Sequence, residues 1–125
     1  AGPVVAAAVV LDRAAAPEGL RDSKTLTEKR RRHLAAELWR TAKIGVGVAS
    51  VDEIDTMNIL RASLLAMARA VANLPVRPAI ALVDGNIKPK LQCRAYTVVD
   101  GDAISVSIAA ASIIAKTTRD RMMTE

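Results

Sequence analysis

Two aspartates stand where apolar segments of the sequence end, and their carboxylates are the side chains most able to do chemistry. Asp84 closes the run Ala79–Val83, and Asp102 follows the run Tyr96–Val99. If both runs are strands of an open α/β sheet, their carboxyl ends lie at the edge where such sheets place their sites. Carboxylate oxygens suit Mg²⁺ or Mn²⁺. Asp, Asn and Gly also form turns, and from composition alone we favour two plain turns over a metal site.

The segment Asp22–Lys24 is a second candidate, because it lies just before a predicted helix start. The Ser23 hydroxyl, the Lys24 ammonium and the free amides of a helix N-terminus together could hold a phosphate. A loop that only caps the helix is the simpler interpretation, and unaided we prefer it. The basic run Lys29–Arg32 could follow a phosphate backbone, but such runs are more often solvated helix faces.

The other reactive residue types form no motif. His33 is the only histidine and Cys93 the only cysteine, so an internal disulfide and a cysteine-based metal cluster are both excluded. We interpret His33 as a surface residue. Asp120 stands between two arginines, and we expect it to form an ion pair rather than to bind a metal.

The elements that must position these residues alternate between strands and helices. The apolar run Val4–Leu11 predicts a buried strand, and Ile44–Val48, in which glycines alternate with apolar residues, predicts another. Together with the two runs that precede the aspartates, and with helices between and after the strands, this order predicts an α/β fold.

Two helix starts carry capping boxes, at Thr25–Glu28 and at Ser50–Glu53. The first predicts a helix to about Ala42, and the second a helix over 51–72 with a break near Asn58. Each has an apolar stripe that should face the sheet. These stripes are Leu34, Leu38 and Ala42 in the first helix, and Leu60, Leu64, Ala68 and Val71 in the second. The residues after Asp102, to about Met123, predict a last helix that is rich in small residues.

The composition restricts the class of partner. The net charge is +5 and the isoelectric point about 9.9, which favours polyanions such as nucleic acid. Aromatic residues make up only 2% of the chain, which argues against base stacking as the main binding mode. No apolar stretch is long enough for a membrane helix, and no signal peptide is visible, so we expect a cytoplasmic protein without a membrane partner.

Several blocks of the sequence together are similar to bacterial ribonuclease HII, in the same order and along essentially the whole chain. The block Ser107–Lys116 is long and the most specific of them. The resembling blocks are Ala1–Leu11, Asp22–Lys24 with Glu28–Arg30, Asn58–Leu60, Leu82–Asn86, Gly101–Asp102, and Ser107–Lys116 followed by Arg119–Arg121.

The resemblance implies a ribonuclease H-like α/β fold, a mixed sheet flanked by helices. It implies an endonuclease that cuts RNA in RNA–DNA hybrids, or at ribonucleotides embedded in duplex DNA, with four carboxylates and two divalent ions, Mg²⁺ or Mn²⁺. Two of the four carboxylates map onto Asp84 and Asp102, which reverses our preference for turns. Ser23 and Lys24 become candidate phosphate contacts, Ser107 a weaker one, and Asn86 a residue that shapes the site.

The same resemblance places the other two carboxylates in an Asp-Glu-Ala-Gly-Arg-Gly segment ahead of Ala1. Residues 1–125 are therefore expected to be part of a catalytic domain, monomeric when complete. Without the first strand of the family sheet we expect unpaired edges and no cleavage by these residues alone. Two alternatives stay open: a nucleic-acid-binding protein without catalysis, and, ranked far lower, a small-molecule α/β domain. Metal-dependent turnover separates the first of these from the enzyme.

Overall fold

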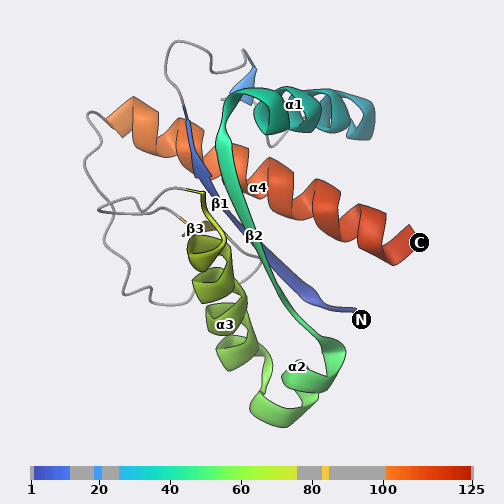
Figure 1. Cartoon of the computed structure of the whole chain (residues 1–125). Helices are drawn as coiled ribbons and strands as arrows, with labels where there is room; N and C mark the ends of the chain where they lie inside the picture. The colour runs from blue at the N-terminus through green and yellow to red at the C-terminus, as the bar shows by residue number, and fades with distance from the viewer. Residues whose placement is uncertain (1, 12–18, 21–25, 76–82, 85–100, 125) are drawn as a thin grey trace.

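The computed structural model describes residues 2–11, 19–20, 26–75, 83–84 and 101–124. A sheet with strand order β2-β1-β3 lies between two layers of helices (Figure 1). Helices α1 and α4 cover one face of the sheet, and α2 and α3 cover the other. The elements in chain order are β1 (Val4–Val10), α1 (Glu28–Thr41), β2 (Lys43–Ala49), α2 (Val51–Met57), α3 (Ile59–Ala72), β3 (Val83–Asp84) and α4 (Gly101–Thr124).

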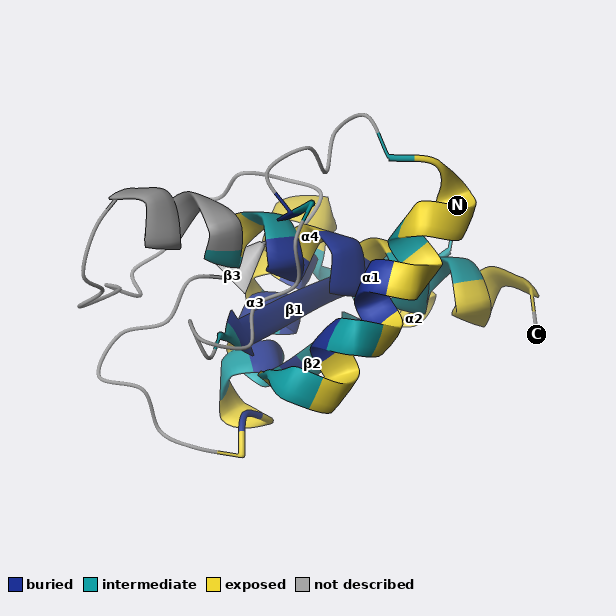
Figure 2. Ribbon diagram, turned by 90° about the horizontal axis from the view of Figure 1, so that it is seen from above, coloured by how far each residue is buried: buried dark blue, intermediate teal, exposed yellow. Residues whose placement is uncertain are grey.

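The central strand β1 is buried on both faces, as its continuous apolar sequence predicts. Its side chains alternate between two apolar clusters, because successive residues of a strand point to opposite faces. Figure 2 shows β1 as a buried element running through the middle of the molecule. The cluster toward α1 and α4 contains Val5, Ala7 and Val9, and the cluster toward α3 contains Val4, Ala6 and Ala8.

Helix α3 approaches β2 so closely that two glycines of the strand are required. A Cβ atom added to Gly47 would lie 1.9 Å from the carbonyl oxygen of Ala66, and one added to Gly45 would lie 2.1 Å from that of Ala70. Both distances are far inside van der Waals contact, so any side chain at either position would push the helix away. The glycines therefore set the distance between this helix and the sheet.

The close approach explains why the predicted apolar stripe of α3 is wrong for three of its four residues, while the fourth, Val71, packs against the core. Leu60 and Leu64 are 48% and 37% exposed, and Ala68 is exposed as well. Alanines and a serine, with Met67 as the one large side chain, are buried instead, and alanines provide the backbone carbonyls that lie closest to the glycines of β2. The buried residues of α3 are Ala62, Ser63, Ala66, Met67 and Ala70. The stripe predicted for α1 is confirmed, with Leu34 and Leu38 buried and Ala42 packed against the same cluster.

The helix starts agree with the sequence in one case and differ in the other. Ser50 and Glu53 form the predicted capping box of α2. The capping box predicted at Thr25 is wrong, because α1 begins at Glu28 and its N-cap is Thr27, whose hydroxyl accepts from the amide of Arg30 at 3.2 Å. The break near Asn58 is confirmed: this residue has a φ of 78° and separates α2 from α3.

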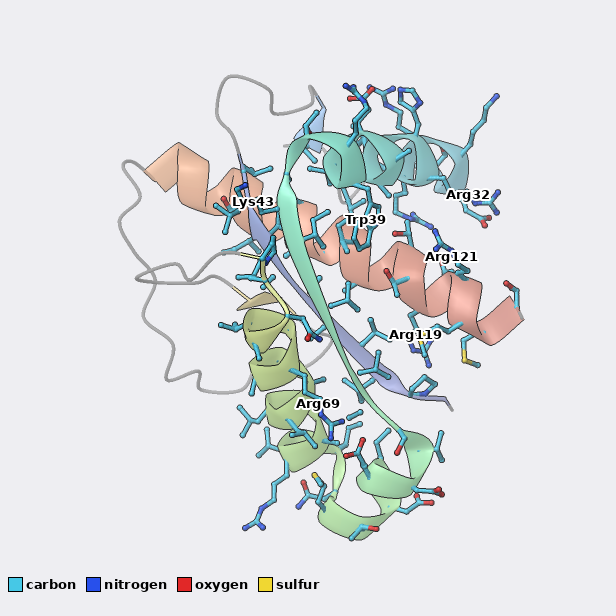
Figure 3. The ribbon with its side chains drawn as sticks, viewed as in Figure 1. Arg32, Trp39, Lys43, Arg69, Arg119 and Arg121 are labelled. Carbon is cyan, nitrogen blue, oxygen red and sulfur yellow. The ribbon has the colours of Figure 1, made fainter. Side chains whose placement is uncertain are left out.

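Two carbonyls at the outer edge of β2 accept hydrogen bonds from side chains of α3 and of its C-cap residue, Asn73. The Arg69 guanidinium donates to the carbonyl of Val48 at 2.7 Å, and the Asn73 amide donates to that of Val46 at 2.8 Å. Arg69, labelled in Figure 3, also makes two hydrogen bonds of 2.7 Å to the two carboxylate oxygens of Glu53. Since exposed strand edges invite pairing with other chains, these contacts both protect the edge and tie α2 to α3.

The Glu53–Arg69 pair should make stability depend on pH. The hydrogen bond from Arg69, and then that from the Ser50 amide, lower the pKa of Glu53 from 4.5 to about 2. A lowered pKa means that the folded state binds fewer protons, so this contribution is full above about pH 4.5 and is lost as pH falls toward 2. In Glu53→Gln the melting temperature should therefore fall relative to the parent above pH 4.5, and the difference should shrink as pH approaches 2.

Thermal melts between pH 2 and 6, followed by circular dichroism, measure this difference. The control is Asp55→Asn, which removes another carboxylate from the same exposed helix. When Glu53→Gln is introduced into Asp55→Asn, the difference in melting temperature that it causes should depend on pH in the same way as in the parent. A constant difference between Glu53→Gln and the parent across the whole range would contradict the assigned ion pair.

The predicted α/β architecture is confirmed. Strands β1 and β2 lie where the sequence placed them, and they pair antiparallel over Val4–Val10. Of the run predicted as a strand before Asp84, only Val83 and Asp84 are described, as β3; the run Tyr96–Val99 lies outside the described residues. The resemblance implied a mixed sheet, and both pairings in the described part of the chain are antiparallel. None of the described helices is long and apolar enough to cross a membrane.

Candidate active site

The backbone of Asp84 lies on β3, an edge strand of the described sheet, beside the middle of the central strand β1. Asp84 is the second residue of β3 and pairs with Ala7 of β1. The Ala7 side chain belongs to the apolar cluster that β1 shares with Ala110, Ala111 and Ile114 of α4. The strand that ends in Asp84 thus runs beside the segment of β1 against which α4 packs, and α4 and β3 also contact each other directly.

Asp102 is the second residue of α4, which begins at Gly101. The prediction that Asp102 belongs to a turn after a strand is wrong in this respect. An aspartate in the first turn of a helix is favoured by the positive end of the helix dipole, which explains how the helix can include it. The same helix contains Ser107, roughly 7 Å further along its axis at 1.5 Å per residue. Ser107 is partly buried.

The structure thus brings two predicted site elements together and leaves others untested. Strand β3 with Asp84 and helix α4 with Asp102 and Ser107 are neighbours. Ser23, Lys24 and Asn86 lie outside the described residues. Within the described ranges, no three or more His, Cys, Asp or Glu side chains are close enough to hold a metal ion.

Several charged residues that we predicted to lie on the surface, without a part in catalysis or metal binding, are found there. Asp120 forms an ion pair with Lys116, one helical turn away on α4, at 3.7 Å. His33 is exposed and lies 2.9 Å from the Glu37 carboxylate on α1. In the basic run 29–32, all but Arg31 are exposed. The predicted solvated helix face is therefore confirmed apart from Arg31, which turns partly inward.

The whole chain matches a protein-family model. The family model described as Ribonuclease HII matches residues 1–125. The chain belongs to the ribonuclease HII family.

Curated relatives in the ribonuclease HII family cover nearly the whole chain. The ribonuclease HII of Parvibaculum lavamentivorans is 62% identical over 98% of this chain and 46% of its own length. That of Ruegeria pomeroyi is 60% identical over 100% of this chain and 54% of its own length. That of Rhizorhabdus wittichii is 55% identical, with 100% and 62% covered. The chain spans about half the length of the curated relatives it matches.

The donor types that β3 and α4 carry fit the metal ions expected for the ribonuclease HII family. Asp84 and Asp102 offer carboxylate oxygens, and the neighbouring Ser107 offers a hydroxyl. Mg²⁺ is commonly held by one or two carboxylates, with water and substrate phosphates as the remaining ligands. A pair of aspartates on adjoining elements is therefore a suitable, although partial, ligand set for a hard divalent cation.

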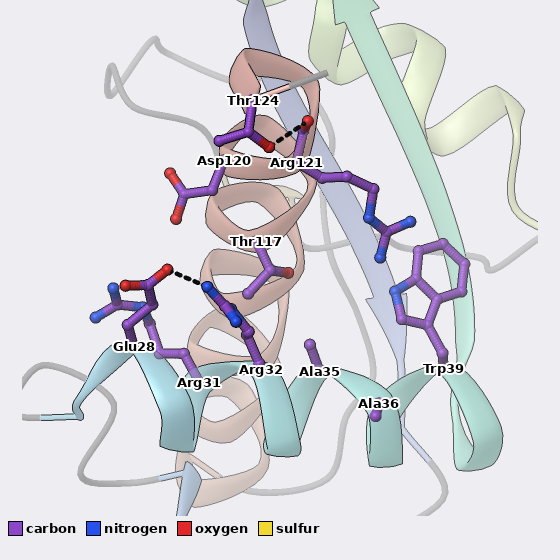
Figure 4. A pocket seen from close by; sticks show the side chains of 10 residues that line it. All are labelled: Glu28, Arg31, Arg32, Ala35, Ala36, Trp39, Thr117, Asp120, Arg121 and Thr124. Carbon is purple, nitrogen blue, oxygen red and sulfur yellow. Dashed lines mark hydrogen bonds and ion pairs between the residues drawn. The ribbon is translucent and has the colours of Figure 1, made fainter.

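One arrangement in this ribonuclease HII family member was missed by sequence reasoning. Trp39 of α1 and Arg121 of α4 line the same groove on the surface of the molecule (Figure 4). They are far apart in the chain, and no motif connects them. The exposed position of Trp39 in an otherwise amphipathic helix was the available signal, because an exposed tryptophan often marks a binding surface.

Proposed function

We propose that the chain is the part of a ribonuclease HII that supplies two of its metal-binding carboxylates, Asp84 and Asp102. The observation that carries the proposal is the match of the family model to residues 1–125. The packing of α4 against β1 and β3 supports it, because Asp102 belongs to α4 and Asp84 to β3. The substrate class is RNA within an RNA–DNA hybrid, or a ribonucleotide within duplex DNA.

Asp84 and Asp102 would hold divalent ions, Mg²⁺ or Mn²⁺, together with ligands from outside this chain. Bound there, two such ions supply an activated water and charge stabilisation for the leaving oxygen. Water attacks the phosphorus on the 5′ side of the ribonucleotide. The bond between this phosphorus and the 3′ oxygen of the preceding nucleotide breaks. The leaving oxygen takes a proton to give a 3′-hydroxyl, and the other product keeps a 5′-phosphate.

We assign substrate binding to four further residues: Ser23, Lys24, Asn86 and Ser107. A lysine and a serine before the start of α1 suit the phosphate backbone, which cations and hydroxyls hold in register without reading sequence. Ser107 lies on α4, further along the helix from Asp102. Its hydroxyl can donate a hydrogen bond to the same phosphate backbone. The ribose 2′-hydroxyl is the group that distinguishes RNA from DNA, so recognition must reach it.

A chimera tests the proposed function. Residues 1–125 replace the matching residues of the Parvibaculum lavamentivorans relative, which they resemble at 62% identity. The chimera should cut a DNA duplex with one embedded ribonucleotide at a single position, 5′ to that ribonucleotide. Cutting should need Mg²⁺ or Mn²⁺ and stop with EDTA. Residues 1–125 alone should not turn over, because the resemblance gives them two of four carboxylates.

The controls decide between the enzyme and its alternatives. An all-DNA duplex of the same sequence should stay intact, which shows that the 2′-hydroxyl is read. Cleavage of both duplexes, or cleavage in EDTA, would contradict the proposed chemistry. A chimera that binds hybrid tightly but never cuts it would favour a nucleic-acid-binding protein without catalysis.

A further inference from the structure

A groove of about 330 Å³ lies between α1 and the C-terminal half of α4, on the surface away from Asp102 (Figure 4). Asp102 and Arg121 are separated along α4 by roughly 28 Å at 1.5 Å per residue, so the groove is not part of the proposed catalytic edge. Its size is within the range of ligand pockets. The side chains used in the argument are Arg31, Arg32 and Trp39 of α1 and Thr117, Asp120 and Arg121 of α4.

The groove keeps positive charge after its internal ion pairs are formed. Arg32 is paired with Glu28, and Asp120 with Lys116. Arg31 and Arg121 remain without a carboxylate partner among the described residues.

The two remaining guanidinium groups have few hydrogen-bond partners among the described residues. Arg31 donates one hydrogen bond, to the carbonyl of Leu26 at 3.0 Å, while its Nε is buried and has no partner in the described part of the chain. The Arg121 side chain is exposed and makes no hydrogen bond to another described residue. Guanidinium groups in this condition bind anionic oxygens strongly, because charged hydrogen bonds replace those otherwise made by water.

An aromatic surface stands beside this charge. Trp39 is 49% exposed, although it is the largest apolar side chain in the chain. Figure 4 shows Arg121 extending toward the Trp39 indole, so the two form one wall of the groove. An indole next to a guanidinium matches a nucleotide: the base stacks on the ring and the phosphate meets the cation. A peptide carboxylate would use the arginine but not the ring.

We propose that this groove binds an unpaired nucleotide of a nucleic-acid strand, with the base on Trp39 and its phosphate at Arg121. Bases in a duplex are stacked on each other and cannot reach the indole, so the bound segment is single-stranded. The contact requires neither a divalent cation nor the two aspartates. It stands apart from the proposed nuclease function, and either can fail without the other.

Trp39 itself reports on the groove, because it is the only tryptophan in the chain. The 125-residue chain is titrated in EDTA with an oligothymidylate of about eight nucleotides, a length within the site size of known single-strand binders. Saturable quenching of the tryptophan fluorescence is expected, with the same dissociation constant as the anisotropy of a labelled oligonucleotide. Trp39→Ala, followed by anisotropy, should weaken binding by about tenfold, the effect of losing one stacked base.

The charge is tested with a matched pair of variants. Arg121→Gln should weaken binding several-fold and reduce the slope of log affinity against log salt by about 0.7, the value for one phosphate contact on a single strand. Arg61→Gln removes an equally exposed arginine from α3 on the opposite face and should change neither. Circular dichroism verifies that each variant is folded.

Three outcomes would overturn the proposal. The first is oligonucleotide binding, seen by anisotropy, without quenching of Trp39. The second is an equal loss of affinity in Arg121→Gln and Arg61→Gln, which indicates unspecific attraction to a basic protein. The third is equally tight quenching by an oligoglutamate of the same charge, which assigns the groove to an acidic protein partner instead.

Discussion

Asp84→Asn in the chimera should lower the cleavage rate by about a thousandfold, or roughly 4 kcal/mol of transition-state stabilisation. The substitution keeps the size of the side chain and removes its charge, and a neutral amide is a much weaker ligand for Mg²⁺ than a carboxylate. Asp84 lies on β3, where it pairs with Ala7 of the central strand β1. Initial rates with the duplex that carries one ribonucleotide, at saturating Mg²⁺, measure the effect.

Two comparisons make this result specific to a shared metal site. Asp55→Asn, on the exposed surface of α2, should keep the parent rate within about twofold, as usual for surface substitutions. If Asp84 and Asp102 serve the same ions, the double variant should be no slower than Asp84→Asn alone, because residues that act as a unit are not additive. An Asp84→Asn rate close to that of the parent would remove Asp84 from the site.

Gly47→Ala should destabilise the fold by about 3 kcal/mol or more, at the upper end of the range for overpacking. The added methyl group would lie 1.9 Å from the Ala66 carbonyl oxygen and 2.4 Å from the Ala70 amide nitrogen. Both are backbone atoms, so the whole of α3 must move for the methyl group to fit. Urea unfolding followed by circular dichroism measures the change. A loss of all folded protein agrees with the same expectation.

A second substitution distinguishes a backbone clash from crowding between side chains. Ala66→Gly removes a methyl group from the helix but leaves its carbonyl oxygen in place. The double variant Gly47→Ala/Ala66→Gly should therefore stay at least as unstable as Gly47→Ala. Restoration of parental stability in the double variant would show that the helix–strand distance is set by side chains rather than by the backbone.

The parts of the fold that the sequence predicts well are those set by local signals. The Ser50–Glu53 capping box, the break at Asn58 and the apolar runs of β1 and β2 each carry their information within a few residues. The wrong expectations depend on distant partners. The face of α3 that turns to the sheet is decided by the glycines of β2, and hydrophobicity alone favoured its leucines.

The candidate site shows the same division. Asp84 stands out as a carboxylate after an apolar run, but composition alone favours a turn, and only the resemblance implies that it is a metal ligand. The start of α4 at Gly101, ahead of Asp102, could not be predicted, because Asp and Gly next to an apolar run are typical of loops as well. The meeting of Trp39 and Arg121 follows from the packing of α1 on α4, which no local pattern records.

The sequence of β1 has a consequence for how the chain folds. Val4–Val10 reads Val-Val-Ala-Ala-Ala-Val-Val in both directions, and both of its faces are buried. A shift of one residue in the register of a strand normally exposes its apolar side chains and is therefore unfavourable. In β1 the same shift only exchanges one apolar face for the other. Correct pairing must then be selected by β2, where Gly45 and Gly47 fit only toward α3. Docking of α3 onto β2 is therefore expected to select the correct register of the β1–β2 pair, whose two strands are connected through α1.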